Sequence, residues 1–267
     1  MTKYLFCVDS DGCVMDTMTY KHQQFFGPLA AKIFEIPKQE TQRFLKSWNQ
    51  INLYSKTRGV NRFVGLLMTL KAHKIKGIQR LDTWVQTTPE FSERALAHEI
   101  YKYQTDDLKK ALQWSKEVNA GIHQTKGLDR PFENALAGLK ALKKYGKVAV
   151  VSSANRDAIE AEWERHGLLV AVDELWCQDR GKKAEIIRQL KLEGYPEQNT
   201  LMIGDAAGDL TAAEQNNVHF YPILVGHEAR SWQELQEVFL PRFLVHQSSE
   251  LEANYLTKFW NNLDQTK

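Results

Sequence analysis

The chain has 267 residues, 43% of them hydrophobic, and a formal net charge of +2 from 35 Lys and Arg against 33 Asp and Glu. A chain of this length can bury a substantial core, either as one large domain or as a domain with an insertion, and we favour the second. The balanced charge argues against nucleic acid or a membrane surface as the partner and favours a small polar substrate.

The cysteines and the N-terminus indicate a cytoplasmic protein. Cys7, Cys13 and Cys177 make an odd number, and two of them fall in or just after the first predicted strand, which favours a reducing compartment over a disulfide framework. The N-terminal MTKYLF leads directly into that strand without a basic and apolar leader, and no apolar run approaches the roughly 20 residues of a membrane span. The oligomeric state stays open.

Short apolar runs predict the strands. Their apolar residues are continuous rather than alternating, which is typical of strands buried on both faces. The clear cases are residues 4–9, 147–153, 200–205 and 219–226, and a weaker fifth is 174–179.

Helical periodicity lies between these runs, at 155–167 and 182–194, and each segment closes on a glycine suited to a helix C-cap. Alternating strands and helices predict an α/β fold, a doubly wound parallel sheet with a Rossmann-like core.

The stretch after the first strand breaks this rhythm. It contains no convincing strand, Pro28 stands at a plausible helix start, and amphipathic runs follow at 38–54, 61–73 and 90–118. We therefore expect an all-helical cap inserted into the core. The predicted domains are 1–17 with 127–267 for the core and 18–126 for the cap.

Polar residues follow the predicted strands, at the sheet edge where parallel sheets bind their ligands. These are Asp9, Asp11, Ser152, Ser153, Asp205 and Asp209. Carboxylates gathered there raise one another's pKa or recruit a cation, and a hard, oxygen-ligated ion such as Mg²⁺ is the simplest partner for the four aspartates.

At this point the chain resembles the haloacid dehalogenase superfamily, in particular phosphatases with a helical cap after the first motif, the phosphoglycolate phosphatase and β-phosphoglucomutase branch. The resemblance rests on DxDGxxxDT at Asp9–Thr17, a strand ending in serine at 148–152, lysine at 182–183 and GDxxxD at Gly204–Asp209. It covers the core, whereas the cap and the C-terminal tail are similar only in being helical.

The resemblance implies the roles of the first motif. Asp9 matches the nucleophile that forms an aspartyl-phosphate, and Asp11 matches the acid that protonates the leaving oxygen and later activates water. Two neighbouring carboxylates are then needed because one attacks while the other moves a proton. Gly12 lets the backbone turn sharply beside the phosphate.

The other motifs imply the supporting residues. Ser152 and the backbone near Ser153 would hold a phosphate oxygen, and one lysine would stabilise Asp9 and the phosphoryl charge. Its register stays open between Lys182 and Lys183, with a slight preference for Lys183. Asp205 matches a metal ligand, and Asp209 either reaches the metal through water or orients the lysine.

Three cations gather in the cap turn at 54–63, Lys56, Arg58 and Arg62. One interpretation is a solvated turn between helices; the other is that Arg58 or Arg62 recognises an anionic group of the substrate.

The sequence thus predicts a Mg²⁺-dependent phosphatase acting on a small phosphomonoester. A sugar phosphomutase on the same scaffold stays an alternative. Phosphonate hydrolysis and dehalogenation are disfavoured, because the resemblance implies that the family branches with those activities lack an acid at the position of Asp11. A non-catalytic phospho-acceptor module is a third hypothesis, disfavoured by the large inserted lid.

Overall fold

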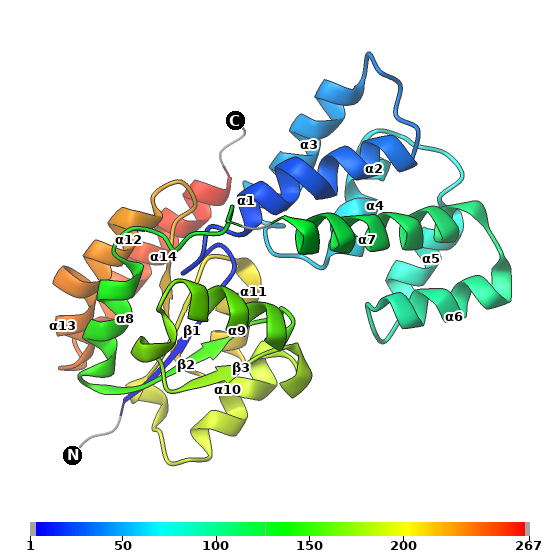
Figure 1. Cartoon of the computed structure of the whole chain (residues 1–267). Coiled ribbons are helices and arrows are strands. Elements are labelled where there is room, and N and C mark those ends of the chain that lie inside the picture. Colours follow the sequence, from blue (N-terminus) through cyan, green and yellow to red (C-terminus); the bar gives the residue numbers. More distant parts are fainter. Residues whose placement is uncertain (1–3, 126, 265–267) are drawn as a thin grey trace. The chain divides into compact units, whose positions relative to one another are not determined.

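A computed structural model describes residues 4–125 and 127–264, which fold into two compact units. One unit, the core, holds the described residues up to Met18 and from Asp129 onward, and the other, the cap, holds Thr19–Leu128. Figure 1 shows the sheet in the core and, in the part of the cap that the structure describes, helices without strands. The sequence predicted the boundaries at 17/18 and 126/127.

The core contains a five-stranded sheet in the order β3-β2-β1-β4-β5, in which every pairing is parallel. The strands are β1 (Tyr4–Val8), β2 (Gly146–Val151), β3 (Glu174–Trp176), β4 (Thr200–Gly204) and β5 (His219–Pro222). The predicted α/β doubly wound fold is confirmed. The chain runs outward from β1 in both directions, so the strand order reverses between β1 and β4, where such sheets bind ligands.

Helices cover both faces of this sheet. Tyr4, Phe6 and Val8 of β1 share one buried cluster with side chains of α8 (Ala135–Lys143) and α9 (Arg156–Arg165). On the other side, α10 and α11 pack against each other. Their bounds are Lys183–Lys191 and Ala207–Glu214, and short 3₁₀ turns lie at Leu169–Ala171, Gln178–Arg180 and Glu197–Asn199.

The helices predicted at 155–167 and 182–194 are confirmed as α9 and α10. The glycines that close the two segments, Gly167 and Gly194, have φ of 65° and 96°, the left-handed conformation expected of glycine after a helix. Strand β5 ends at Pro222, short of the predicted 226, because its partner β4 ends at Gly204, which pairs with Pro222.

The C-terminal tail, whose role the sequence left open, packs on the core. It forms α12 (Glu228–Glu234), a π-helical segment (Leu235–Phe239), α13 (Leu240–Phe243) and α14 (Ser249–Leu263). Glu252 of α14 accepts a hydrogen bond from the Phe220 amide at 2.9 Å, and its carboxylate lies 2.6 Å from His219 Nδ1. The last helix therefore protects β5, an edge strand of the sheet.

The cap is all-helical. Its helices are α1 (Met18–Tyr20), α2 (Gly27–Ile33), α3 (Thr41–Leu53), α4 (Arg62–Ala72), α5 (Gln79–Thr87), α6 (Glu93–Tyr103) and α7 (Asp106–Gln124), with a π-helical segment at Lys21–Phe26 between α1 and α2. Trp48, Trp84 and Trp114 lie in its hydrophobic core, at most 3% exposed.

The expectation of a helix start at Pro28 is confirmed, since α2 begins at Gly27 and Pro28 lies at its start. Helical backbone nevertheless already runs from Met18 through the π-helical segment before it. Within that segment's last turn the amide of Gly27 donates to the carbonyl of His22, five residues back. A proline inside an α-helix lacks one donor and clashes with a carbonyl of the preceding turn, and a π-helical turn is a known way to absorb such a clash.

The run at 90–118 was expected to be continuous, but it contains the end of α6 and the start of α7. The chain turns at Gln104, which has a left-handed φ of 53°, and two acidic residues, Asp106 and Asp107, open α7. Helix α5 was not predicted. The Leu81 amide, in the first turn of α5, donates a hydrogen bond to Asp107 of α7 at 2.8 Å. Another helix therefore stabilises the start of α5.

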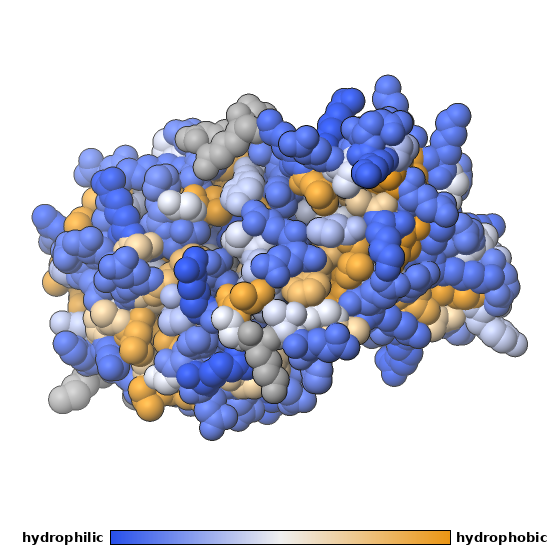
Figure 2. All heavy atoms as spheres, turned by 45° about the horizontal axis from the view of Figure 1, so that its top comes forward, coloured by the Kyte–Doolittle hydropathy of each residue, from blue (hydrophilic) through white to orange (hydrophobic). Residues whose placement is uncertain are grey.

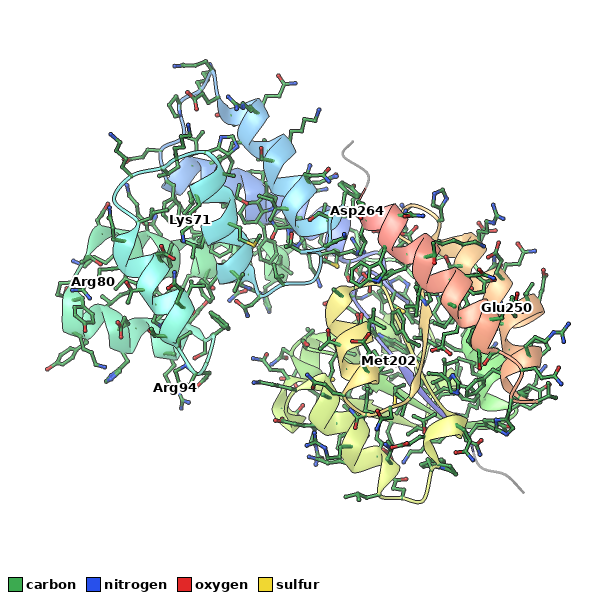
Figure 3. The ribbon with its side chains drawn as sticks, turned by 180° about the vertical axis from the view of Figure 1, so that it is seen from behind. Lys71, Arg80, Arg94, Met202, Glu250 and Asp264 are labelled. Carbon is green, nitrogen blue, oxygen red and sulfur yellow. The ribbon has the colours of Figure 1, made fainter. Side chains whose placement is uncertain are left out.

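Charge is divided unequally between the two units. Residues 19–128 carry 18 Lys and Arg against 9 Asp and Glu, whereas the rest of the chain carries 17 against 24. Figure 2 shows hydrophilic side chains over most of the visible surface, and Figure 3 shows Lys71, Arg80 and Arg94 projecting from the cap helices. The cap is therefore a basic unit and the core an acidic one.

Candidate active site

The loop after β1 is a tight, hydrogen-bonded turn. The amide of Asp9 continues the sheet ladder by donating to the Ile203 carbonyl at 2.9 Å. Gly12 has a φ of 84° and donates to the carbonyl of Met15 at 2.8 Å. The turn therefore needs the left-handed conformation that glycine adopts without strain.

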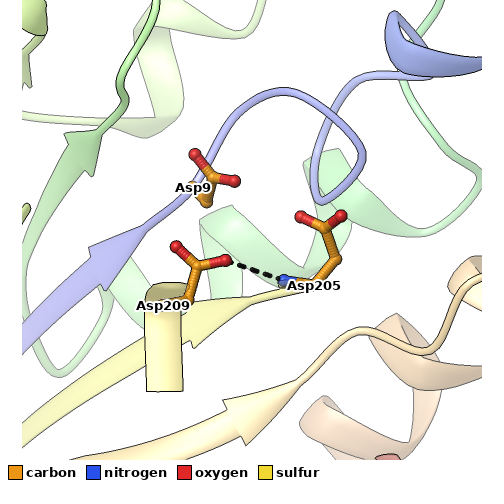
Figure 4. A group of neighbouring side chains, drawn as sticks. All are labelled: Asp9, Asp205 and Asp209. Carbon is orange, nitrogen blue, oxygen red and sulfur yellow. Dashed lines mark hydrogen bonds between the residues drawn. The ribbon is translucent and has the colours of Figure 1, made fainter. Parts of the chain in front are cut away.

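Three buried carboxylates meet at the carboxyl edge of the sheet (Figure 4). Asp9, Asp205 and Asp209 are 5%, 1% and 0% exposed, and each offers an oxygen within 4.8 Å of the others. Asp9 and Asp205 follow the neighbouring strands β1 and β4, while Asp209 belongs to the first turn of α11. The parallel sheet thus joins residues that are far apart in the sequence.

Lys183 is the cation within this carboxylate group. Its Nζ lies 2.7 Å from Asp9 Oδ1 and 2.6 Å from Asp209 Oδ1. Lys182 is exposed and precedes the first residue of α10, and its amide donates to the Glu185 carboxylate at 3.0 Å. Of the two lysines left open by the sequence, the structure brings Lys183 to the carboxylates.

Burial and neighbouring charge shift the pKa values in this group. Burial raises the pKa of Asp9 well above its usual value; Lys183 opposes this, and the charges of Asp209 and Asp205 add to it. Burial lowers the pKa of Lys183, but Asp209 and Asp9 outweigh that effect and raise it above its usual value. Lys183 is therefore charged at neutral pH.

Two backbone amides hold the Asp209 carboxylate in addition to Lys183. Its Oδ2 accepts hydrogen bonds from the amides of Asp205 and Ala206, both at 3.1 Å, while Oδ1 faces Lys183. A Cβ on Gly204 would lie 2.4 Å from the Asp209 carboxylate. Glycine at 204 is thus required by close packing, a role that the motif alone did not reveal.

Asp11 does not join the carboxylate group. Its carboxylate accepts a hydrogen bond from the hydroxyl of Thr17, the last residue of the first motif. Asp16, the residue before Thr17, accepts hydrogen bonds from the Arg130 side chain at 3.1 and 3.3 Å. Asp9 and Asp11 are therefore held by different partners.

Ser152 directly follows β2, which pairs with β1, and so lies at the same sheet edge. Its amide donates to the Trp176 carbonyl at 2.9 Å, and its hydroxyl accepts from the Ala154 amide at 3.1 Å. Ser152 is 2% exposed, whereas Ser153 is exposed.

The two candidate arginines lie in the cap. Arg58 is 4% exposed and donates from Nη1 to the Leu53 carbonyl at 2.8 Å. Arg62 donates to Asn119 Oδ1 at 2.6 Å, and its guanidinium lies 5.0 Å from the centre of the Phe26 ring. Both guanidinium groups make contacts that fix their orientation within the cap.

The donor set fits a divalent cation. Three carboxylates and one ammonium share a buried site, and carboxylate oxygens are the ligands that hard cations prefer. Asp9 and Asp205 are the best placed to hold it, because the Asp209 oxygens already serve Lys183 and two amides.

Two further contacts escaped sequence reasoning. Ser10, between the two aspartates, accepts a hydrogen bond from the Trp163 indole, and the Trp232 indole donates to the Cys13 carbonyl at 2.9 Å. The only signal in the sequence was that Ser10 is a polar residue at the end of a buried strand. Its partner Trp163 lies 153 residues away, so no local pattern joins the two.

Solved structures share this architecture. A haloacid dehalogenase-like hydrolase from Streptococcus pneumoniae has a TM-score of 0.53 and 12% identity, with 86% of this chain and 91% of that chain covered. A predicted phosphoglycolate phosphatase from Haemophilus somnus also has a TM-score of 0.53, with 14% identity and coverage of 83% and 85%. At these identities the likeness establishes the fold. A search of curated proteins finds no match.

The chain is a doubly wound parallel sheet with buried carboxylates at its carboxyl edge. The model of the haloacid dehalogenase-like hydrolases matches residues 5–217, and the chain belongs to this family. No helix among the described residues is long and apolar enough to cross a membrane.

Proposed function

We propose that the protein is a Mg²⁺-dependent phosphatase that hydrolyses a small phosphomonoester through an aspartyl-phosphate on Asp9. The observation that carries this proposal is the placement of Asp9 among Lys183, Asp205 and Asp209 at the switch point of the sheet. A buried carboxylate paired with a lysine suits a nucleophile that must attack a phosphoryl group.

In the proposed reaction an Asp9 oxygen forms a bond to phosphorus while the bond to the leaving oxygen breaks, and Asp11 gives that oxygen its proton. Asp11 then takes a proton from water, whose oxygen attacks phosphorus and releases Asp9. Lys183 neutralises charge on the phosphoryl oxygens, and Ser152, the backbone near Ser153 and Gly12 would contact them. When bound, the cation would neutralise further phosphoryl charge.

We further propose a class of substrate. The structurally similar protein from Haemophilus somnus is a predicted phosphoglycolate phosphatase, which supports a small phosphorylated acid as substrate. We assign Arg58 or Arg62 to its non-reacting anionic end, since the preset orientation of each guanidinium lowers the cost of binding an anion. We also propose that the protein is cytoplasmic, which agrees with its three buried free cysteines.

A sugar phosphomutase would use the same two aspartates, and membership in a hydrolase family favours hydrolysis over both this reaction and a phospho-acceptor module. The test is a Mg²⁺-supplemented phosphate-release screen over phosphosugars, phosphoglycolate and nucleotides, with product analysis to separate hydrolysis from isomerisation. Asp9→Asn is the control, because its amide keeps the shape but cannot attack phosphorus. Phosphate release that survives Asp9→Asn would overturn the nucleophile assignment, and isomerisation without release would replace the phosphatase by the mutase.

A further inference from the structure

Ser10 lies between the two aspartates of the first motif and faces a different partner from either. Its side chain is fully buried, and its hydroxyl accepts a hydrogen bond from the indole N–H of Trp163 at 2.8 Å. Trp163 is also fully buried. A hydrogen bond between two buried groups is costly to break on one side, because the remaining group loses its partner away from water.

Helix α9, which carries Trp163, is fixed at both ends. It begins just after the Ser152 turn, where the Asn155 side chain accepts hydrogen bonds from the amides of Asp157 and Ala158. Near its other end, Arg165 forms an ion pair with the buried Asp129. The indole therefore extends from a well-anchored element to the loop of the first motif.

The backbone that follows Ser10 is fixed as well. The Ser10 carbonyl accepts from the amides of Cys13, Val14 and Met15, at 3.2, 3.0 and 2.9 Å. The side chain and the following peptide of Ser10 are thus both held, and this peptide leads directly into Asp11.

We propose that the Trp163–Ser10 hydrogen bond positions Asp11 for proton transfer to the leaving oxygen. The inference rests on the proposed phosphatase function and adds two positioning residues to it. Asp9 is held independently by Lys183 and the sheet ladder, so loosening Ser10 displaces Asp11 more than the nucleophile. General acid catalysis is sensitive to such displacement, because the proton donor must lie within hydrogen-bond reach of the leaving oxygen.

The test compares two leaving groups. An alkyl phosphate needs a proton on its leaving alkoxide, whereas p-nitrophenolate leaves without one. Trp163→Phe and Ser10→Ala each remove one partner, and each should lower kcat roughly ten- to a hundredfold for an alkyl phosphate with less than about a twofold change in KM. In the first turnover, release of p-nitrophenolate should lose only a small part of its rate, whereas release of the alcohol should fall by the same roughly ten- to hundredfold. The first turnover is compared because the later attack of water needs Asp11 with both substrates.

A double variant and an exchange measurement separate positioning from general damage. If the two residues act as a unit, the combined variant should lose little more kcat than the worse single variant. Hydrogen exchange at the Trp163 indole, followed by NMR, should accelerate in Ser10→Ala relative to the wild-type chain.

Trp232→Phe is the matched control, since it removes another buried indole bond to the same loop, at the Cys13 carbonyl. It should lower thermal stability without the difference between leaving groups. Equal losses of the first-turnover rate with both substrates in Trp163→Phe and Ser10→Ala, or the same leaving-group difference in Trp232→Phe, would overturn the inference. A wild-type chain that releases phosphate from neither substrate would instead reject the proposed function, and the role of the pair with it.

Discussion

Lys182 and Lys183, at the start of α10, have different surroundings: Lys182 is exposed, and Lys183 pairs with two carboxylates. We therefore expect their replacement by methionine to affect kcat differently. Lys183→Met should lower kcat at least about a hundredfold, because it removes the charge beside Asp9 and leaves a buried group of three carboxylates without its ammonium. Lys182→Met should stay within about twofold, since exposed charges away from a site contribute little.

Steady-state kinetics of both variants with p-nitrophenyl phosphate provide the measurement, and circular dichroism checks that each is folded. A large loss in Lys182→Met with normal activity in Lys183→Met would show that the other lysine serves the reaction.

Gly204 is constrained by the carboxylate beside it. In Gly204→Ala the new Cβ would lie 2.4 Å from Asp209, which must move and so release Lys183 or the amides of Asp205 and Ala206. We expect a loss of roughly 1–3 kcal/mol in the free energy of unfolding, in line with overpacking of other cores. Chemical denaturation measures it.

Gly208→Ala is the control for this change, because nothing lies within 4 Å of a Cβ at that position. It should be neutral or slightly stabilising, since alanine favours a helix over glycine. Similar losses in the two variants would contradict the packing argument.

At the scale of elements, α9 is tied to the chain that returns from the cap. Asp129, 6% exposed, accepts from Arg165 and lies 2.9 Å from His166 Nε2. Burial by itself would raise the pKa of Asp129, but the hydrogen bond with His166 and the charge of Arg165 outweigh it and lower the pKa.

A lowered pKa in the folded state stabilises the fold above the unfolded pKa of about 3.9, and this contribution is lost as the pH falls through the folded value. Asp129→Asn should therefore be less stable by roughly 1.5–3 kcal/mol at pH 7, and the difference should shrink below about pH 4. Urea unfolding at several pH values measures it.

Asp16→Asn provides the comparison, because Asp16 pairs with Arg130, whose side chain is 77% exposed. Its effect should stay below about 1 kcal/mol. A pH-independent difference for Asp129→Asn would show that the ionised carboxylate does not stabilise the fold.

Some helices and strands were predicted from the sequence and others were not. The difference depends on whether the interactions that form an element are local or join residues far apart in the sequence. The strands were evident because burial on both faces makes their apolar runs continuous. Helix α5 was not, because Asp107 of another helix caps its first turn, and the left-handed Gln104 that divides the run at 90–118 carries no distinctive residue type.

The same distinction holds for the candidate site. Asp9, Asp205 and Asp209 stand at strand ends or a helix start, so topology alone predicts that they meet. The lysine register depended on where α10 begins, and the pairing of Ser10 with Trp163 joins positions 153 residues apart. Contacts of that range are decided by packing and leave no local pattern.

For the whole molecule, the unequal charge of the two units bears on substrate capture. The core is acidic, with 24 acidic residues against 17 basic ones, so by itself it repels a phosphate ester, while the cap has 18 basic residues against 9 acidic ones. A basic unit raises the local concentration of anions and loses this effect as salt screens it. The cap is thus expected to supply the long-range attraction for substrate.

This expectation predicts how kcat/KM responds to salt and to charge reversal. Raising the ionic strength from about 0.01 M to 0.15 M, which shortens the Debye length from about 30 to 8 Å, should lower kcat/KM for a bisphosphate more steeply than for p-nitrophenyl phosphate. In the cap, Lys46→Glu with Lys76→Glu reverses two exposed cations and should lower the low-salt value by roughly two- to tenfold, with kcat unchanged. In the core, Lys140→Glu with Lys144→Glu changes the net charge equally and serves as the control. Equal losses in the two double variants would mean that total charge, rather than the basic cap, attracts the substrate.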